Sequence, residues 1–188
     1  MSSALDDASK GITFFQWMIL GTLTLTSTLY AMSMTIANIA LPQLQGALGA
    51  TQDQIAWTVT FNIIGTAIVT PMTGWLTLRF GQRRLMLCAI FGFATSSILC
   101  GQANALPELV IYRVFQGAFG GPLVPLSQAI ILGVFPRRLH SFATAVWGMG
   151  VVCGPIIGPT VGGYISEAYS WRWIFYIIAP FSLLALLG

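Results

Sequence analysis

Charge is scarce in this sequence. Its 188 residues include 8 Lys or Arg and 5 Asp or Glu, so that 7% are charged, whereas 56% are hydrophobic. Water-soluble domains carry about 25% charged residues, because polar groups must cover their surface. Together with a mean hydropathy of +0.81, the shortage of charge excludes an ordinary soluble domain. We expect a polytopic membrane protein whose first partner is the lipid bilayer.

Lysine, histidine and cysteine are also rare. Lys10 is the one lysine, so the sequence lacks a GxxxxGK[ST] phosphate-binding loop, and ATP is not expected to be the energy source. His140, the one histidine, lies beside two arginines, where we expect it to be solvated or to face lipid headgroups. The 3 cysteines lie in apolar stretches without CxxC spacing and are expected to be small core residues. Neither a metal nor a cofactor is expected.

The carboxylates are few and scattered. Beyond the first ten residues they are Asp53, Glu108 and Glu167, which fall in three different predicted loops. Hydrolytic acid–base catalysis needs such groups within reach of one reacting atom, so the sequence does not indicate an enzyme. Asp53 has a local explanation, because Thr51 to Gln54 has the T-x-x-Q spacing of a capping box and an acid stabilises a helix N-terminus.

Six long apolar runs are what the sequence does contain. A membrane-spanning helix needs roughly 20 mostly apolar residues. The predicted spans are 15–41, 55–76, 85–103, 109–132, 142–165 and 173–188. The last holds about 16 residues, or roughly 24 Å of helix, and we expect it to be a truncated sixth helix of a longer protein. The predicted fold is an all-α polytopic membrane protein with an N-terminal tail at 1–14 and a six-helix domain at 15–188.

Basic residues indicate the orientation, because Lys and Arg concentrate in short cytoplasmic loops. One side of the predicted helices carries Lys10, Arg79, Arg83, Arg84, Arg137 and Arg138, and the other carries Arg172. The N-terminal tail is therefore expected to be cytoplasmic, and the net charge of +3 reflects topology rather than a nucleic-acid partner. The opening MSSALDDASK is acidic where a signal peptide is basic, so the first helix is expected to be retained.

Glycines form a regular stripe where the chain reads GVVCGPIIGPTVGG. The stripe consists of Gly150, Gly154, Gly158 and Gly162, with Gly163 beside it. Residues four apart share one face of a helix, and a face of small residues lets a second helix approach closely in lipid. Pro155 and Pro159 lie on an adjacent stripe, where each removes a backbone donor and bends the helix. Two roles remain open: a face on which a helix outside this segment slides, and permanent packing within the six helices.

Arg113 is the ionisable residue that lies well inside a predicted span. Burying an arginine there costs about 2.5 to 3.5 kcal/mol on insertion scales, so it needs a reason. It lies about six residues, or roughly 9 Å, from Pro107 at the external end, and Gln116 follows at i+3. Ser33 and Asn38 of the first span lie at comparable depth. Two interpretations are open: an arginine in a water-filled cavity coupled to substrate or proton, and one that snorkels outward or ties helices together.

These motifs resemble the N-terminal half of a major facilitator superfamily transporter, and the resemblance covers nearly the whole chain. GWLTLRFGQRR at 74–84 is similar to the family's loop between helices 2 and 3, RVFQG at 113–117 to its RxxQG signature in helix 4, and GPIIGPTVGGYI to its helix 5 antiporter motif. TIANIALP at 35–42, GPLVPLSQ at 121–128 and WRWIF at 171–175 resemble the fourteen-helix drug:proton antiporters of the EmrB type.

The resemblance implies a fold of two six-helix halves, each built of two inverted three-helix repeats, with the substrate near the bilayer midplane. The chain would be one wall of this fold, without its C-terminal half. The implied function is proton-coupled export of amphipathic drugs or toxic compounds by alternating access. The implied location is the bacterial inner membrane, and a periplasmic membrane-fusion adaptor with an outer-membrane channel is the implied partner.

The resemblance also assigns roles to residues. Arg113, Gln116, Ser33 and Asn38 would belong to the pathway of substrate and protons. Gly74, Arg79, Gly81, Arg83 and Arg84 would form the loop that gates the change of conformation. The glycine stripe with Pro155, Pro159 and Gly163 would be the antiporter motif.

Two departures from the family pattern bear on mechanism. Ser33 stands where relatives usually carry an Asp that takes up and releases protons, and serine does not titrate there. Leu78 replaces the usual Asp of the loop motif, which weakens its charge relay with Arg79 and Arg83. Two alternatives therefore remain beside proton-coupled drug export. One is an exporter or facilitator of a specific anionic metabolite that binds Arg113, and the other is a truncated half without independent transport.

Overall fold

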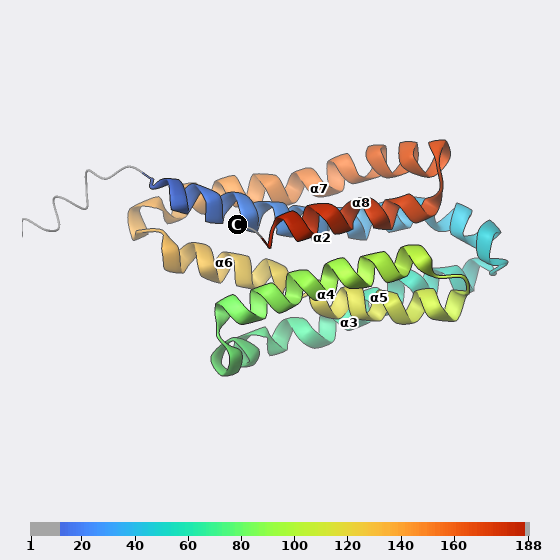
Figure 1. The fold of residues 1–188 in the computed structure, drawn as a ribbon, viewed down its shortest axis with the longest axis horizontal. Helices are drawn as coiled ribbons and strands as arrows, with labels where there is room; N and C mark the ends of the chain where they lie inside the picture. Colours follow the sequence, from blue (N-terminus) through green and yellow to red (C-terminus); the bar gives the residue numbers. More distant parts are fainter. Residues whose placement is uncertain (1–11, 187–188) are drawn as a thin grey trace, which may run out of the picture.

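The protein is helical almost throughout in a computed structural model that describes residues 12–186. The helices, labelled as in Figure 1, are α2 (Phe14–Leu48), α3 (Gln52–Phe80), α4 (Gln82–Gln102), α5 (Leu106–Gly120), α6 (Leu123–Val134), the 3₁₀ turn η1 (Arg137–Leu139), α7 (His140–Ala168) and α8 (Trp171–Leu184). In this part of the chain five helical spans are long and apolar enough to cross a membrane, with α5 and α6 together forming one, and α8 is a shorter apolar helix. The predicted all-α fold is confirmed, with five long apolar spans and the shorter α8 in the place of the sixth. The predicted tail lies mostly outside the described residues.

Local chemistry explains several helix ends. Thr51 Oγ1 accepts from the Gln54 backbone N–H at 3.3 Å, and Gln54 Oε1 accepts from the Thr51 N–H at 3.0 Å, so the predicted capping box is confirmed. Gly81 has a φ of +82°, a conformation that glycine adopts at little cost, and it joins α3 directly to α4. The predicted end of the first span at residue 41 is wrong, because α2 continues through Pro42 to Leu48. Proline removes only one helical hydrogen bond when the helix bends around it.

The helices form two layers (Figure 1). One layer contains α7, α2 and α8, and the other contains α3, α5 with α6, and α4. The helix α4 packs along α8 and joins the layers at one edge, whereas α3 and α7 make no comparable contact at the other edge. In the most apolar windows of α3 and α7 only 22% of residues are buried, against 44 to 56% in the other long spans. These two helices therefore have the most surface left for contacts outside the described bundle.

Glycines allow the closest helix contacts within each layer. A Cβ on Gly154 of α7 would lie 2.6 Å from the backbone oxygen of Thr28 on α2, and a Cβ on Gly158 would lie 2.7 Å from Thr35 Oγ1. Gly150 and Gly162 likewise face α2 side chains. The glycine stripe thus packs within the six helices, which is the second of the two roles that the sequence left open, because α2 occupies that face.

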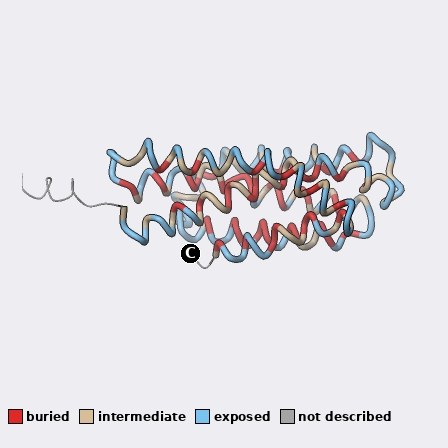
Figure 2. Tube along the Cα trace, turned by 90° about the horizontal axis from the view of Figure 1, so that it is seen from above, coloured by how far each residue is buried: buried red, intermediate tan, exposed pale blue. Residues whose placement is uncertain are grey.

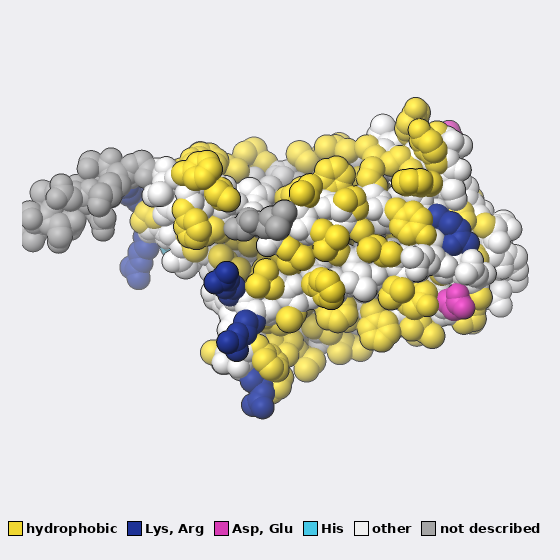
Figure 3. Space-filling view, viewed as in Figure 1, with side chains coloured by type: hydrophobic (Ala, Val, Ile, Leu, Met, Phe, Trp, Pro, Cys, Tyr) yellow, Lys and Arg dark blue, Asp and Glu magenta, His cyan; other side chains and the backbone are white. Residues whose placement is uncertain are grey.

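The surface is apolar along the length of the bundle. Buried residues line the interior (Figure 2), while hydrophobic side chains cover the visible face and most visible Lys and Arg gather toward one end (Figure 3). Ile156 of α7 is 68% exposed, as suits a helix surrounded by lipid or by other apolar helices. Of the cysteines only Cys100 is buried, whereas Cys88 and Cys153 are exposed. The predicted core position is wrong for these two, because an apolar run in a membrane protein does not distinguish core from lipid-facing positions.

Candidate functional site

Arg113 lies in the interior of the bundle, on the second turn of α5. Its side chain is 2% exposed, and Nη1 donates a hydrogen bond to Gln116 Oε1 at 2.7 Å. Gln116 Nε2 in turn donates to Ser97 Oγ of α4 at 2.8 Å, and Ser97 Oγ donates to the Phe93 backbone oxygen at 2.8 Å. The predicted pair of Arg113 and Gln116 therefore lies together, and it ties α5 to α4.

An aromatic ring covers the guanidinium from the other layer. Arg113 Cζ lies 5.0 Å from the centre of the Phe175 ring of α8, within the range of a cation–π interaction. The carboxylates of the described segment, Asp53, Glu108 and Glu167, are exposed at the helix ends and do not neutralise it. Arg113 is thus a buried charge held by neutral groups, and its Nε has no hydrogen-bond acceptor within residues 12–186.

Asn62 of α3 is a polar neighbour of Arg113 that the sequence did not indicate. It is 3% exposed, and its Nδ2 donates to the Arg113 backbone oxygen at 2.8 Å. One turn further along, Thr66 Oγ1 donates to the Gly117 backbone oxygen at 3.2 Å. The recurrence of Thr58, Asn62, Thr66 and Thr70 every four residues on one helix face is the signal that could have revealed this polar seam.

Ser33 and Asn38 are not brought into this network. Ser33 is buried, and its hydroxyl donates to the Tyr30 backbone oxygen of its own helix at 2.7 Å. Asn38 is exposed, and its Nδ2 donates to the Met34 backbone oxygen at 3.1 Å. Neither side chain is hydrogen-bonded to Arg113 or Gln116 in the described structure, because both bond to the backbone of α2 itself.

The loop motif lies at one end of the bundle, where α3 passes into α4. Gly74, Arg79, Gly81, Arg83 and Arg84 are all exposed. Leu78, in the place of the family's usual Asp, is 90% exposed. The arginines thus form a basic surface to which Leu78 contributes no acid, as expected from the sequence.

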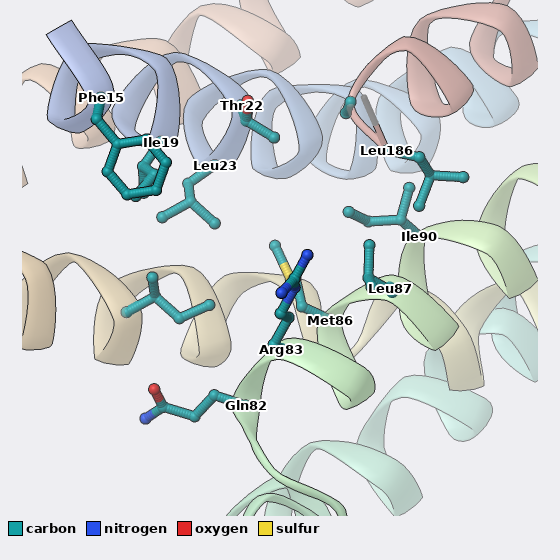
Figure 4. Close-up of a pocket in the computed structure, with 12 residues that line it drawn as sticks. Phe15, Ile19, Thr22, Leu23, Gln82, Arg83, Met86, Leu87, Ile90 and Leu186 are labelled. Carbon is teal, nitrogen blue, oxygen red and sulfur yellow. The ribbon is translucent and has the colours of Figure 1, made fainter. Parts of the chain in front are cut away.

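A cleft of about 620 Å³ opens near the same end, between α2 and α4 (Figure 4). Figure 4 shows Ile19 and Leu23 of α2 facing Met86 of α4 across it, with Arg83 beside Met86. Ala185 and Leu186, which follow α8, also line the cleft. Arg113 is not among its lining residues, so the buried charge does not open into this cleft.

The remaining residues of the antiporter motif, which lies on α7, face outward. Pro155 is exposed and Pro159 is half-buried, while a Cβ on Gly163 would meet no atom within 4 Å. The motif therefore has two faces: the glycine stripe against α2, and a proline face that α2 does not cover.

Comparisons with known proteins agree with this architecture. The profile of the Major Facilitator Superfamily matches residues 23–188. "Multidrug export protein EmrB" of Haemophilus influenzae is 45% identical over 161 residues, 86% of this chain and 32% of that protein. "Fatty acid resistance protein FarB" of Neisseria gonorrhoeae is 41% identical over 151 residues, 80% of this chain and 30% of that protein. The chain spans about a third of the length of these curated relatives.

A solved structure shares the fold. The xylose transporter XylE of Escherichia coli, in a partially occluded inward-open conformation, superimposes with a TM-score of 0.82 at 19% identity. The match covers 92% of this chain and 48% of that one. The six helices thus have the fold of half of such a transporter.

Proposed function

Because the chain belongs to the Major Facilitator Superfamily and its helices form the N-terminal half of that fold, we propose that it is one wall of a secondary active exporter. Its substrates are amphipathic drugs or related toxic compounds. The observation that carries the proposal is the 45% identity, over 86% of the chain, to a protein named for multidrug export.

Alternating access gives the exposed helices a role. The least buried spans, α3 and α7, offer their outer faces to the other half of the transporter, which rocks against them as the substrate site opens to either side. On α7 this contact uses the proline face rather than the glycine stripe, which α2 occupies. The whole protein is a multi-pass protein of the inner membrane with a cytoplasmic N-terminus, since Arg79, Arg83 and Arg84 lie where the positive-inside rule places cytoplasmic residues.

Coupling to protons is proposed to pass through Arg113. A buried cation without a counter-charge stabilises the ionised form of any carboxylate that reaches it, and it attracts an anionic substrate in the same way. Because Ser33 does not titrate, the acid that exchanges with protons is supplied by the other half of the transporter. A periplasmic adaptor with an outer-membrane channel completes the export route by the same resemblance.

A second candidate function is export of anionic amphiphiles. It is favoured by the 41% identity to a protein named for fatty acid resistance and by a cation, Arg113, that lacks an acidic partner in the described segment. In this case the substrate's own carboxylate would pair with Arg113.

Efflux from cells that lack their own pumps and express the protein from its complete reading frame separates these candidates. Cells are loaded with a fluorescent lipophilic cation or with a labelled long-chain fatty acid, with and without a protonophore, beside an empty-vector control. Energised efflux of the cation supports drug export, and efflux of the fatty acid alone supports the second candidate. Efflux of neither compound above the control contradicts both candidates.

A further inference from the structure

Asn62 holds the Arg113 backbone through one half of its amide. Nδ2 donates to the Arg113 carbonyl oxygen at 2.8 Å, and only the NH₂ group of an amide can donate, so Oδ1 must be the other end. Oδ1 is buried and has no donor within the described residues. A leucine of similar size would avoid burying an unpaired amide oxygen, so packing alone does not account for asparagine at this position.

The contact is enforced by backbone rather than by flexible side chains. A Cβ on Gly117 of α5 would collide with the backbone oxygen of Asn62, and one on Gly65 of α3 would collide with the backbone oxygen of Val114. The two helices therefore touch at the level of Arg113. Asn62 and Thr66, four residues apart, bond to carbonyl oxygens that are also four residues apart, and so fix the register of α3 on α5.

We infer that Asn62 is a positioning residue for Arg113: by fixing the height of α5 on α3, it sets where the guanidinium lies relative to Phe175 of α8. The inference rests on the proposed function, in which Arg113 takes part in coupling. A small displacement of a coupling group changes transport far more than it changes folding, because the reacting geometry is demanding.

The test is a double-mutant cycle in the full-length transporter, with proton-driven efflux measured per molecule in the membrane. Asn62→Leu should lower the maximal rate about fivefold or more, the factor that one ordinary hydrogen bond supplies, without raising KM. In an Arg113→Lys background the same change should add little, because a residue that acts through Arg113 has no separate effect. Thr95→Val is the control, because the exposed Thr95 hydroxyl of α4 donates within its own helix, to the Phe91 backbone oxygen at 2.8 Å, and this variant should export nearly as the wild type does.

Asn62→Asp gives a second readout if the leucine variant does not accumulate. A protonated carboxyl group can donate to the Arg113 carbonyl and an ionised one cannot, so this variant should lose activity relative to wild type as the pH rises. An unchanged pH profile, or equal losses from Asn62→Leu in both backgrounds, would overturn the inference alone. A wild-type protein that exports nothing would overturn the proposed function and this inference with it.

Discussion

At the scale of single residues, the groups around Arg113 determine how its buried charge is stabilised. Its partners in the described structure are an amide oxygen at 2.7 Å and an aromatic ring at 5.0 Å, and neither carries a charge. A charge-assisted hydrogen bond contributes about 1.5 to 3 kcal/mol and a cation–π contact about 0.5 to 2 kcal/mol. These contributions are of the size of the roughly 2.5 to 3.5 kcal/mol that inserting an arginine costs. They keep Arg113 inside the bundle while its charge stays available.

Substitution of Arg113 separates this account from a purely structural one. Arg113→Ala should reduce export per molecule at least about tenfold, the effect of losing a buried charge contact of some 1.4 kcal/mol or more, while the amount of protein in the membrane is kept. Arg113→Lys keeps the charge but not the planar fork, and should retain part of the activity. Quantitative immunodetection and initial efflux rates are the measurements. Full efflux by the alanine variant would remove Arg113 from the mechanism.

The sequence revealed one neighbour of Arg113 and missed the other for a physical reason. Gln116 follows at i+3 on the same helix, so the helix alone brings the two side chains together. Asn62 is 51 positions away and meets Arg113 only because α3 docks on α5 through Gly65 and Gly117. For Ser33, the sequence allowed a contact that the described structure does not contain. Its depth in the span allowed a contact with Arg113, but its hydroxyl is satisfied within α2.

At the scale of elements, small residues determine which helices touch. Apolar runs predicted the five long spans and the shorter sixth helix, because length and hydropathy suffice to place a helix in a bilayer. The partner of a glycine stripe is not visible in this way, since any helix can use a face of small residues. The structure assigns that face to α2, and it leaves the proline face of α7 open.

A matched pair of glycine substitutions tests this assignment. Gly154→Ala places a methyl group 2.6 Å from the Thr28 backbone oxygen, where neither helix can yield without shifting. Overpacking of this kind costs about 1 to 3 kcal/mol, so thermal unfolding of the purified full-length protein should move to lower temperature and export should fall. Gly163→Ala, with open space around the new methyl group, should leave the unfolding temperature and export nearly unchanged. Equal shifts for both variants would contradict packing of the stripe against α2.

At the scale of the whole molecule, the bundle is closed along one edge and uncovered along the other. The contact between α4 and α8 joins the two layers, whereas α3 and α7 present apolar faces with few buried residues. The sequence indicated this division only in part. The arginines at one end predict which end of the bundle faces the cytoplasm. The pairing of helices into layers depends instead on contacts between residues far apart in the chain.

The most direct test of the central claim, that this wall belongs to a proton-coupled exporter that uses Arg113, is proton movement during transport. Full-length protein is reconstituted in vesicles with an imposed pH gradient and an enclosed pH-sensitive dye, and a lipophilic cation is added as substrate. We expect substrate to accelerate collapse of the gradient in wild-type vesicles and to have no such effect with Arg113→Ala. Substrate movement at the same rate with or without the gradient, and without proton movement, would contradict the account.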